Sequence, residues 1–177
     1  MIEMAKKMKP EEALTPEYVK EYKQYCKDLK ETLELSELPA SKQKSIYNLL
    51  TYRQSVILAY RSLDKQIDAI EKEMQKVKKQ YENEPDNAKA NILADRYNKL
   101  HSKGEYLIEN CNHFADEIED MKKKKDKQVK EYQKELDLAL NKKGYELVKP
   151  PKKARFVTTT KQNSLKNTSA LRKGPLN

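Results

Sequence analysis

The chain has 177 residues, 37% of them charged, and contains only 3 Gly, 2 Phe and no Trp. This composition excludes a thick globular core and favours long helices that bury narrow apolar stripes. The net charge of +9 is concentrated near the C-terminus. Residues 145–177 hold eight Lys or Arg against one acid, whereas residues 1–144 hold 29 basic against 27 acidic residues.

The first predicted helix covers residues 16–35 and follows an N-terminal extension, residues 1–14, that carries no strong signal. Thr15 is a suitable N-cap, and Pro16 is a suitable first helical residue. The helix is expected to end before Pro39, because proline disfavours helix in the residue before it. Apolar residues recur at steps of three and four, the spacing of a coiled-coil stripe, at Val19, Tyr22, Cys26, Leu29 and Leu33.

The second predicted helix covers residues 41–82, with Ser41 as its cap. It carries the most regular pattern in the chain, eleven positions with the same spacing of three and four. Ten of them are apolar or aromatic, and Arg53 is the exception. Such regularity predicts a continuous buried stripe at Ile46, Leu49, Arg53, Val56, Tyr60, Leu63, Ile67, Ile70, Met74, Val77 and Tyr81.

The third predicted helix covers residues 87–143, after a turn around Pro85 and before Gly144, a suitable C-terminal residue. Its stripe breaks register at Lys125 and Gln128 and then resumes in a shifted position. The regular part comprises Ala90, Leu93, Tyr97, Leu100, Gly104, Leu107, Cys111, Phe114, Ile118 and Met121. The shifted part comprises Val129, Tyr132, Leu136 and Leu140.

A short turn between two long stripes predicts an all-α fold built on a long antiparallel helical hairpin, a coiled coil. Extra apolar residues widen the first half of residues 41–82, at Leu50, Tyr52, Ile57 and Ala59. Ile108 and Ala115 of the third helix are expected opposite them. A third helix, residues 16–35, is therefore expected to pack at the base of the hairpin and leave its tip two-stranded. The alternative is that residues 16–35 and 41–82 lie collinear and both pair with the third helix.

The shifted stripe at Val129, Tyr132, Leu136 and Leu140 extends beyond this expected bundle. An apolar stripe without a partner tends to find another surface. We therefore expect a homodimer or a partner helix at these four residues, unless residues 1–14 fold over them.

The C-terminal segment, residues 145–177, has no apolar periodicity and is rich in Ser, Thr, Asn and Lys. It cannot bury enough surface to offset the entropy of ordering, so a disordered tail is predicted after the helical body, residues 15–144. The run from Lys149 to Arg155 resembles a nuclear localisation signal and would equally contact phosphates or acidic proteins. The candidate polyanion-binding residues are Lys149, Lys152, Lys153, Arg155, Lys161, Lys166, Arg172 and Lys173.

A second basic cluster follows Met121, where the regular stripe ends. One interpretation is a solvated stretch at the end of the bundle, and the other is a basic collar that binds a polyanion. The cluster comprises Lys122, Lys123, Lys124, Lys125 and Lys127.

No set of catalytic or metal-binding residues is evident, and no cofactor is expected. Cys111 and His113 are two residues apart, so on a helix they point about 200° apart, which suits neither one metal nor a nucleophile and its base. Cys111 is expected in the core. Two cysteines do not form a disulfide framework, and no signal peptide or apolar run of about 18 residues is present, so an intracellular chain without a membrane span is predicted.

Two functions fit these patterns. The first is a non-enzymatic scaffold or adaptor subunit whose body binds protein partners and whose tail docks on an acidic surface, a cytoskeletal filament in the cytoplasm or chromatin in the nucleus. The second is a nucleic-acid-binding protein that uses the tail and the lysine cluster, with the coiled coil setting the oligomeric state. The near-neutral body favours the first. An enzyme is disfavoured, because narrow stripes leave no room for a substrate pocket.

Overall fold

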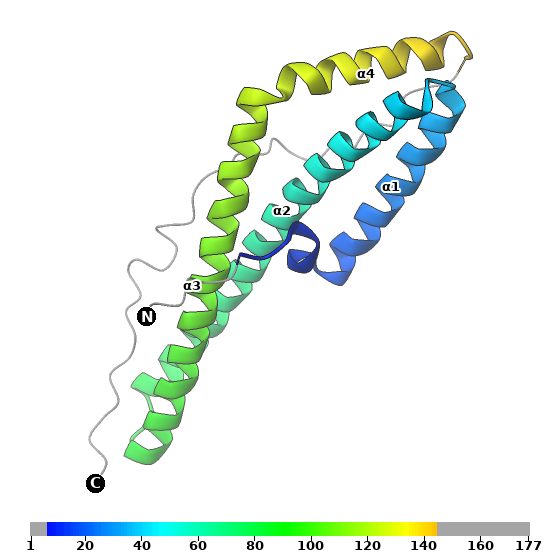
Figure 1. Cartoon of the computed structure of the whole chain (residues 1–177). Coiled ribbons are helices and arrows are strands. Elements are labelled where there is room, and N and C mark those ends of the chain that lie inside the picture. The colour runs from blue at the N-terminus through cyan, green and yellow to red at the C-terminus, as the bar shows by residue number, and fades with distance from the viewer. Residues whose placement is uncertain (1–6, 145–177) are drawn as a thin grey trace.

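The computed structural model describes residues 7–144, and within them 88% of the residues are helical and no strand occurs. The elements follow one another as a 3-10 helix and four α-helices (Figure 1). They are η1 (Pro10–Ala13), α1 (Pro16–Ser36), α2 (Ala40–Glu82), α3 (Asn87–Lys124) and α4 (Asp126–Asn141). The all-helical prediction and the predicted bounds of the first two helices are confirmed within one residue. The predicted disordered tail lies outside the described residues.

The helix ends follow the sequence signals in part. Thr15 occupies the N-cap position of α1, but its side chain makes no capping bond. The predicted cap at Ser41 is wrong, because α2 begins at Ala40 with Pro39 in the cap position. Asp86 does cap α3, accepting a hydrogen bond from the Ala88 N–H at 2.9 Å.

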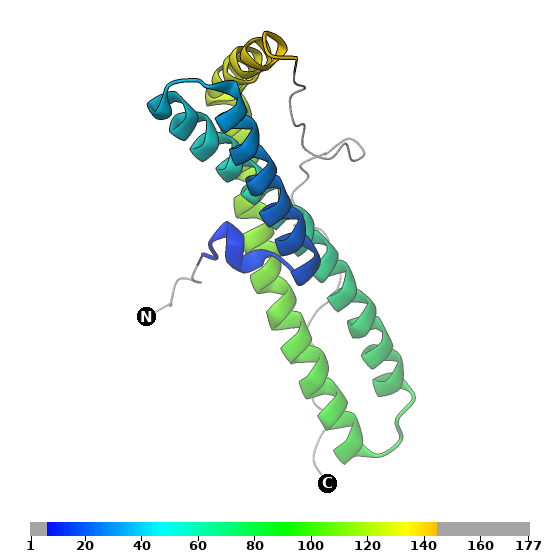
Figure 2. The same ribbon diagram turned by 90° about the vertical axis from the view of Figure 1, so that its right-hand side faces the viewer.

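Helices α2 and α3 form the long antiparallel hairpin (Figures 1 and 2). From Val56 onward the predicted stripe of α2 faces the stripe of α3, whereas Ile46 and Leu49 pack with α1 and α4. The side chains of both stripes are buried or half-buried. The hairpin cluster joins residues from Val56 to Val77 on α2 with residues from Tyr97 to Met121 on α3. Six side chains of this cluster are completely buried, namely Val56, Ala59, Leu63, Val77, Cys111 and Phe114.

The segment before α1 covers the middle of this hairpin. Ala13 is buried, and Met8 and Leu14 pack beside it on the hairpin cluster. The Met8 N–H donates a hydrogen bond to Asn110 Oδ1 at 2.8 Å, and Ser62 Oγ donates to the Ala13 carbonyl at 2.9 Å. Residues that carried no sequence signal therefore form part of the core.

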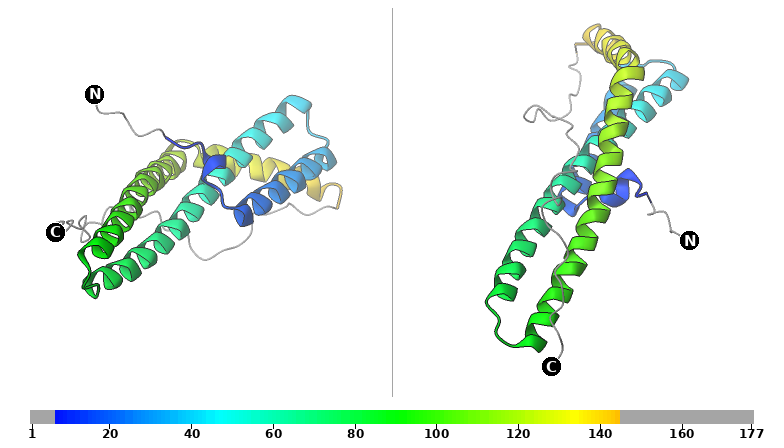
Figure 3. Two further views of the ribbon diagram at one scale, coloured as in Figure 1. Left: turned by 90° about the horizontal axis from the view of Figure 1, so that it is seen from below. Right: turned by 90° about the vertical axis from the view of Figure 1, so that its left-hand side faces the viewer.

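The predicted continuous third helix is wrong. Lys125 has φ −120° and ψ −2°, and it separates α3 from α4. The two stripes explain the bend: Met121 and Val129 are eight residues apart, which rotates the apolar face by about 80° on a straight helix. Bending at Lys125 lets α4 turn across the end of the α1–α2 pair (Figures 1 and 3).

Helix α1 folds back along the first part of α2 and is not collinear with it (Figure 3). A second cluster, the end cluster, holds α1, the start of α2 and α4 together. Its buried residues are Tyr25, Leu29, Leu33, Ile46, Leu50, Val129, Leu136 and Leu140. Helix α1 therefore packs on the base of the hairpin through α2, as expected. No residue of α3 belongs to the end cluster, and α4 supplies its third side.

The shifted stripe therefore has a partner inside the chain. Leu136 and Leu140 are completely buried, Val129 is 5% exposed, and Tyr132 packs against the same cluster. The expectation that these residues lie unpaired is wrong, because the bend at Lys125 and the fold-back of α1 bring two apolar faces together. This burial removes the reason for a homodimer through the stripe.

Candidate functional site

The lysine cluster lies at the α3–α4 bend. Lys122, Lys123 and Lys124 form the last turn of α3, Lys125 is the junction, and Lys127 lies in the first turn of α4. All five are exposed. Cations at the C-terminal end of a helix are stabilised by its dipole. This interaction explains why lysines are favourable in the last turn of α3, whether or not they bind a ligand.

Part of this charge is neutralised locally. Lys122 pairs with Glu119 at 3.7 Å, and Lys124 pairs with Asp120 at 3.2 Å. Among the described residues, no ion pair engages Lys123, Lys125 or Lys127. Three cations thus remain available to a ligand at the bend.

A groove of about 420 Å³ opens beside the cluster, between α2 and α4. Lys125 is the only cation that lines it, and most of the other lining side chains carry hydroxyl or amide groups. They are Ser45, Asn48, Leu49, Tyr52, Gln128 and Tyr132. The side chains of this groove, called the bend groove, can therefore form hydrogen bonds with a ligand and bind one negative charge. This groove was not predicted, because its two walls come from helices that the predicted topology did not place together.

One wall of the bend groove is fixed by a contact with α3. The Tyr52 hydroxyl donates a hydrogen bond to Glu117, and His113 Nε2 lies 3.8 Å from the same carboxylate. Burial raises the pKa of Glu117, and burial together with Lys7 lowers the pKa of His113. Both pKa shifts favour the neutral forms of Glu117 and His113. The contact among Tyr52, His113 and Glu117 is therefore hydrogen-bonded and is not a strong salt bridge.

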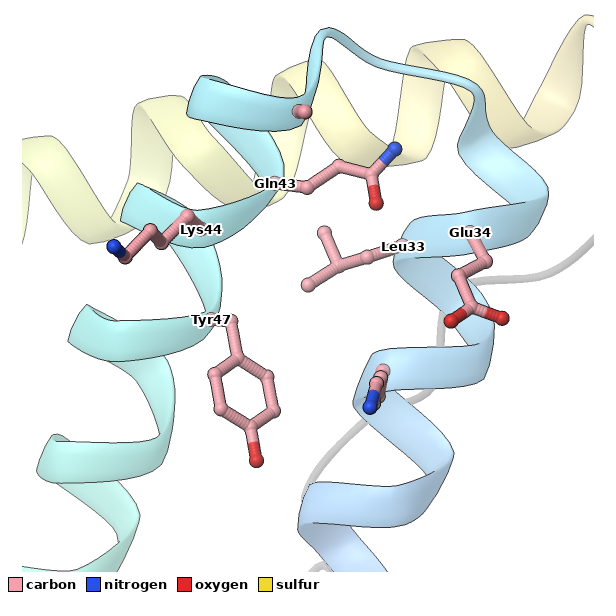
Figure 4. A pocket seen from close by; sticks show the side chains of 7 residues that line it. Leu33, Glu34, Gln43, Lys44 and Tyr47 are labelled. Atoms are coloured by element: carbon pink, nitrogen blue, oxygen red, sulfur yellow. The ribbon is translucent and has the colours of Figure 1, made fainter.

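A smaller groove of about 290 Å³ lies between α1 and α2 near their connection (Figure 4). Leu33 projects toward α2 and the Tyr47 ring stands between the helices, whereas Lys44 points outward. The amide of Gln43 donates a hydrogen bond to the Leu38 carbonyl at 2.7 Å, which ties the start of α2 to the connection. This groove is small and open, and its charged lining residues are Lys30, Glu34 and Lys44.

The thiols occupy structural positions. Cys111 is completely buried, and its sulfur lies 3.8 Å from the Tyr60 carbonyl, as the core prediction required. Cys26 is half-buried beside Tyr22 and Tyr47, and the pKa values of both tyrosine hydroxyls are raised, first by burial. In residues 7–144, no group of three or more His, Cys, Asp or Glu is arranged to hold a metal ion.

The primary predicted site cannot be placed. All eight tail cations, from Lys149 to Lys173, lie outside the described residues. The structure therefore places one of the two predicted basic sites, the lysine cluster at the bend. Among the described helices, none combines the length and apolarity that a membrane crossing requires.

Comparisons with known proteins give no relative. No protein-family model, curated protein or solved structure matches the sequence. The function is therefore inferred from the residues and their arrangement.

Proposed function

We propose that the chain is a non-enzymatic scaffold or adaptor subunit of a larger intracellular assembly. The coiled-coil body binds protein partners, and the basic tail docks on an acidic surface, a cytoskeletal filament or chromatin. The observation that carries this proposal is the separation of charge along the chain. Residues 145–177 hold eight basic residues and one acid, while the preceding 144 residues are almost neutral.

The described body supports the proposal by its shape and surface. The grooves on the described body are open, and each is lined by residues of only two neighbouring segments. An elongated helical body presents a long exposed face to partners, whereas substrate sites are concave and bury most of their ligand.

Replacing Lys152, Lys153 and Arg155 by Gln tests the role of the tail. A flexible basic segment gains affinity by releasing counterions, so removing its densest cluster should weaken binding to an acidic surface and should displace the protein in cells. The measurements are cosedimentation with filaments or nucleosomes and localisation of the tagged full chain. The matched control replaces Lys72, Lys76 and Lys79 on α2, which removes the same charge from the body. Normal binding and localisation of the tail variant would contradict the proposal.

A nucleic-acid-binding protein is the second candidate, and the lysine cluster favours it. Lys123, Lys125 and Lys127 are exposed at one bend and have no ion pair in the described part of the chain. Retention on immobilised DNA across a salt series separates the two functions. A steep fall of affinity with salt that flattens when these three lysines become Gln supports direct phosphate contacts. A shallow slope supports the adaptor.

A further inference from the structure

Helix α1 lies toward the viewer in Figure 2. A row of lysines runs along its exposed side. Lys20, Lys23 and Lys27 are three and four residues apart, so they project from one side of the helix. All three are exposed. No ion pair engages any of them within residues 7–144.

Two neighbouring carboxylates have partners of their own. Glu17 pairs with Lys65 of α2 at 3.1 Å. Asp28 accepts a hydrogen bond from the Gln24 amide at 2.8 Å. The three lysines line a groove whose lining includes no carboxylate.

The row borders a groove of about 660 Å³, larger than the other two. One end is apolar, formed by Leu14, Pro16 and Val19, and the other is formed by the lysine row with Gln24. The apolar end of the groove is held in place by contacts with the hairpin. The Thr15 N–H donates a hydrogen bond to Ser62 Oγ at 3.0 Å, and Ala13 is buried on the hairpin. A preformed surface of this kind binds a ligand at a low entropic cost.

We propose that this groove binds an acidic amphipathic helix of a partner protein. Its carboxylates, spaced three and four residues apart, lie along Lys20, Lys23 and Lys27, and one apolar side chain fills the end at Leu14, Pro16 and Val19. This inference rests on the proposed role of the body in binding protein partners and names the class of partner.

Charge and shape favour an acidic helix over three other occupants, namely the chain's own tail, a single-stranded nucleic acid and a membrane surface. The chain's own tail carries the same sign as the lysine row. The lining residues include no aromatic ring on which a base could stack, and stacking contributes much of the affinity for single strands. A membrane surface binds helices whose broad apolar face enters the bilayer, whereas this face is mainly cationic.

The test uses the full chain and a fluorescent, helix-stabilised peptide with Glu at three positions spaced like the lysines and one Leu beyond them. The probe of matched shape has Gln in place of Glu. Fluorescence anisotropy is measured at low and moderate salt. One variant carries Lys20→Gln, Lys23→Gln and Lys27→Gln. The charge-matched control carries Lys72→Gln, Lys76→Gln and Lys79→Gln on exposed positions of α2.

The acidic peptide should bind, and the α1 variant should lose about tenfold in affinity, because three exposed ion pairs are lost together. The control should stay within about twofold, and the Gln peptide should bind neither protein. Val19→Ser should weaken binding without changing its salt dependence, because it removes apolar contact only. Circular dichroism confirms that each variant is folded.

Equal affinities of the α1 variant and the control, or no binding of the acidic peptide, would overturn the inference. Loss of binding in the Lys152, Lys153 and Arg155 variant alone would also overturn it, while leaving the docking role of the tail intact. Phosphatidylserine vesicles and a single-stranded oligonucleotide are tested in parallel. Binding of either one that depends on Lys20, Lys23 and Lys27, where the peptide fails, would identify a different partner.

Discussion

At the scale of single residues, Ser62 connects the segment before α1 to the hairpin. Its hydroxyl donates to the Ala13 carbonyl at 2.9 Å and accepts from the Thr15 N–H at 3.0 Å and the Gln66 amide at 3.2 Å. The side chain is completely buried. One serine therefore bonds to two backbone groups in the connection between η1 and α1.

Ser62→Ala should lower the free energy of unfolding by about 1–3 kcal/mol, because it leaves the Thr15 N–H without its acceptor. It also removes one of the two donors to the Ala13 carbonyl, the other being the Gln66 amide at 3.2 Å. Ser55→Ala is the matched control. Ser55 is also buried on α2, but its hydroxyl bonds only to the Tyr52 carbonyl of its own helix, at 2.7 Å. Urea unfolding measures both variants. Equal losses would show that the turn does not depend on Ser62.

Tyr25 gives the end cluster a pH dependence. Burial raises the pKa of Tyr25 from 10.0 to about 12, despite the nearby charge of Arg53. Below pH 10 the hydroxyl is protonated in the folded and unfolded states, so its contribution is constant. Between pH 10 and pH 12 the unfolded state ionises first, so the free energy of unfolding falls as pH rises, by roughly 2–3 kcal/mol in total.

Thermal melts at several pH values between 9 and 12 should show this fall. Tyr25→Phe should flatten it, since phenylalanine does not ionise. A slope that survives in Tyr25→Phe would assign the alkaline sensitivity to other groups, among them Tyr22 and Tyr47, whose pKa values are raised in the same direction.

At the scale of the elements, α4 is held by a few apolar side chains. Leu136 is completely buried in the end cluster, whereas Leu138 on the same helix is 55% exposed. Two ion pairs add to the contact, Lys42 with Glu135 at 3.3 Å and Lys143 with Glu37. These pairs are largely exposed, so they contribute little beside the apolar burial.

Leu136→Ala should lower the free energy of unfolding of the end cluster by about 2–5 kcal/mol, because it removes buried methyl groups and leaves a cavity. Leu138→Ala should change it by no more than about 0.5 kcal/mol. Hydrogen exchange of amides in α1 and α4 provides the measurement. Similar exchange rates in the two variants would contradict the packing of α4 on α1.

At the scale of the whole molecule, two apolar clusters share α2 but no residue. The hairpin cluster runs from Val56 toward the tip, and the end cluster begins at Ile46 and Leu50 on α2. Toward the tip, the cluster draws only on α2 and α3 among the described residues. Such an arrangement allows each part to open locally without the other.

Ile67→Asp should therefore unfold the tip of the hairpin, because it buries an unpaired charge at a position that is 1% exposed. The amides of α1 and α4 should remain protected from hydrogen exchange. The control is Glu73→Gln, which removes an exposed pair with Arg96 and should cost a few tenths of a kcal/mol. Loss of protection throughout residues 16–141 would show that the two clusters unfold as one unit.

The sequence by itself determined most of the helical residues and the buried faces of α2 and α3. On α1 the prediction was partly wrong, because Tyr18 and Tyr25 are buried where Val19 and Cys26 were expected. The stripe on α2 from Ile46 to Tyr81 predicted its helix and its pairing with α3, since a short turn at Pro85 leaves little choice of partner. The basic character of residues 122–127 was equally plain. These features depend on local periodicity and on chemistry within a few residues.

The tertiary structure alone decided what covers each stripe away from the hairpin. A stripe shows that Leu136 is buried, but not that α1 buries it, because the partner is about one hundred residues away in sequence. The bend at Lys125, the packing of Ala13 and the groove beside Lys20 follow from that choice. Local periodicity specifies a helix and its apolar face. Burial of that face is favourable against any apolar surface that the chain brings to it, so periodicity does not specify the partner.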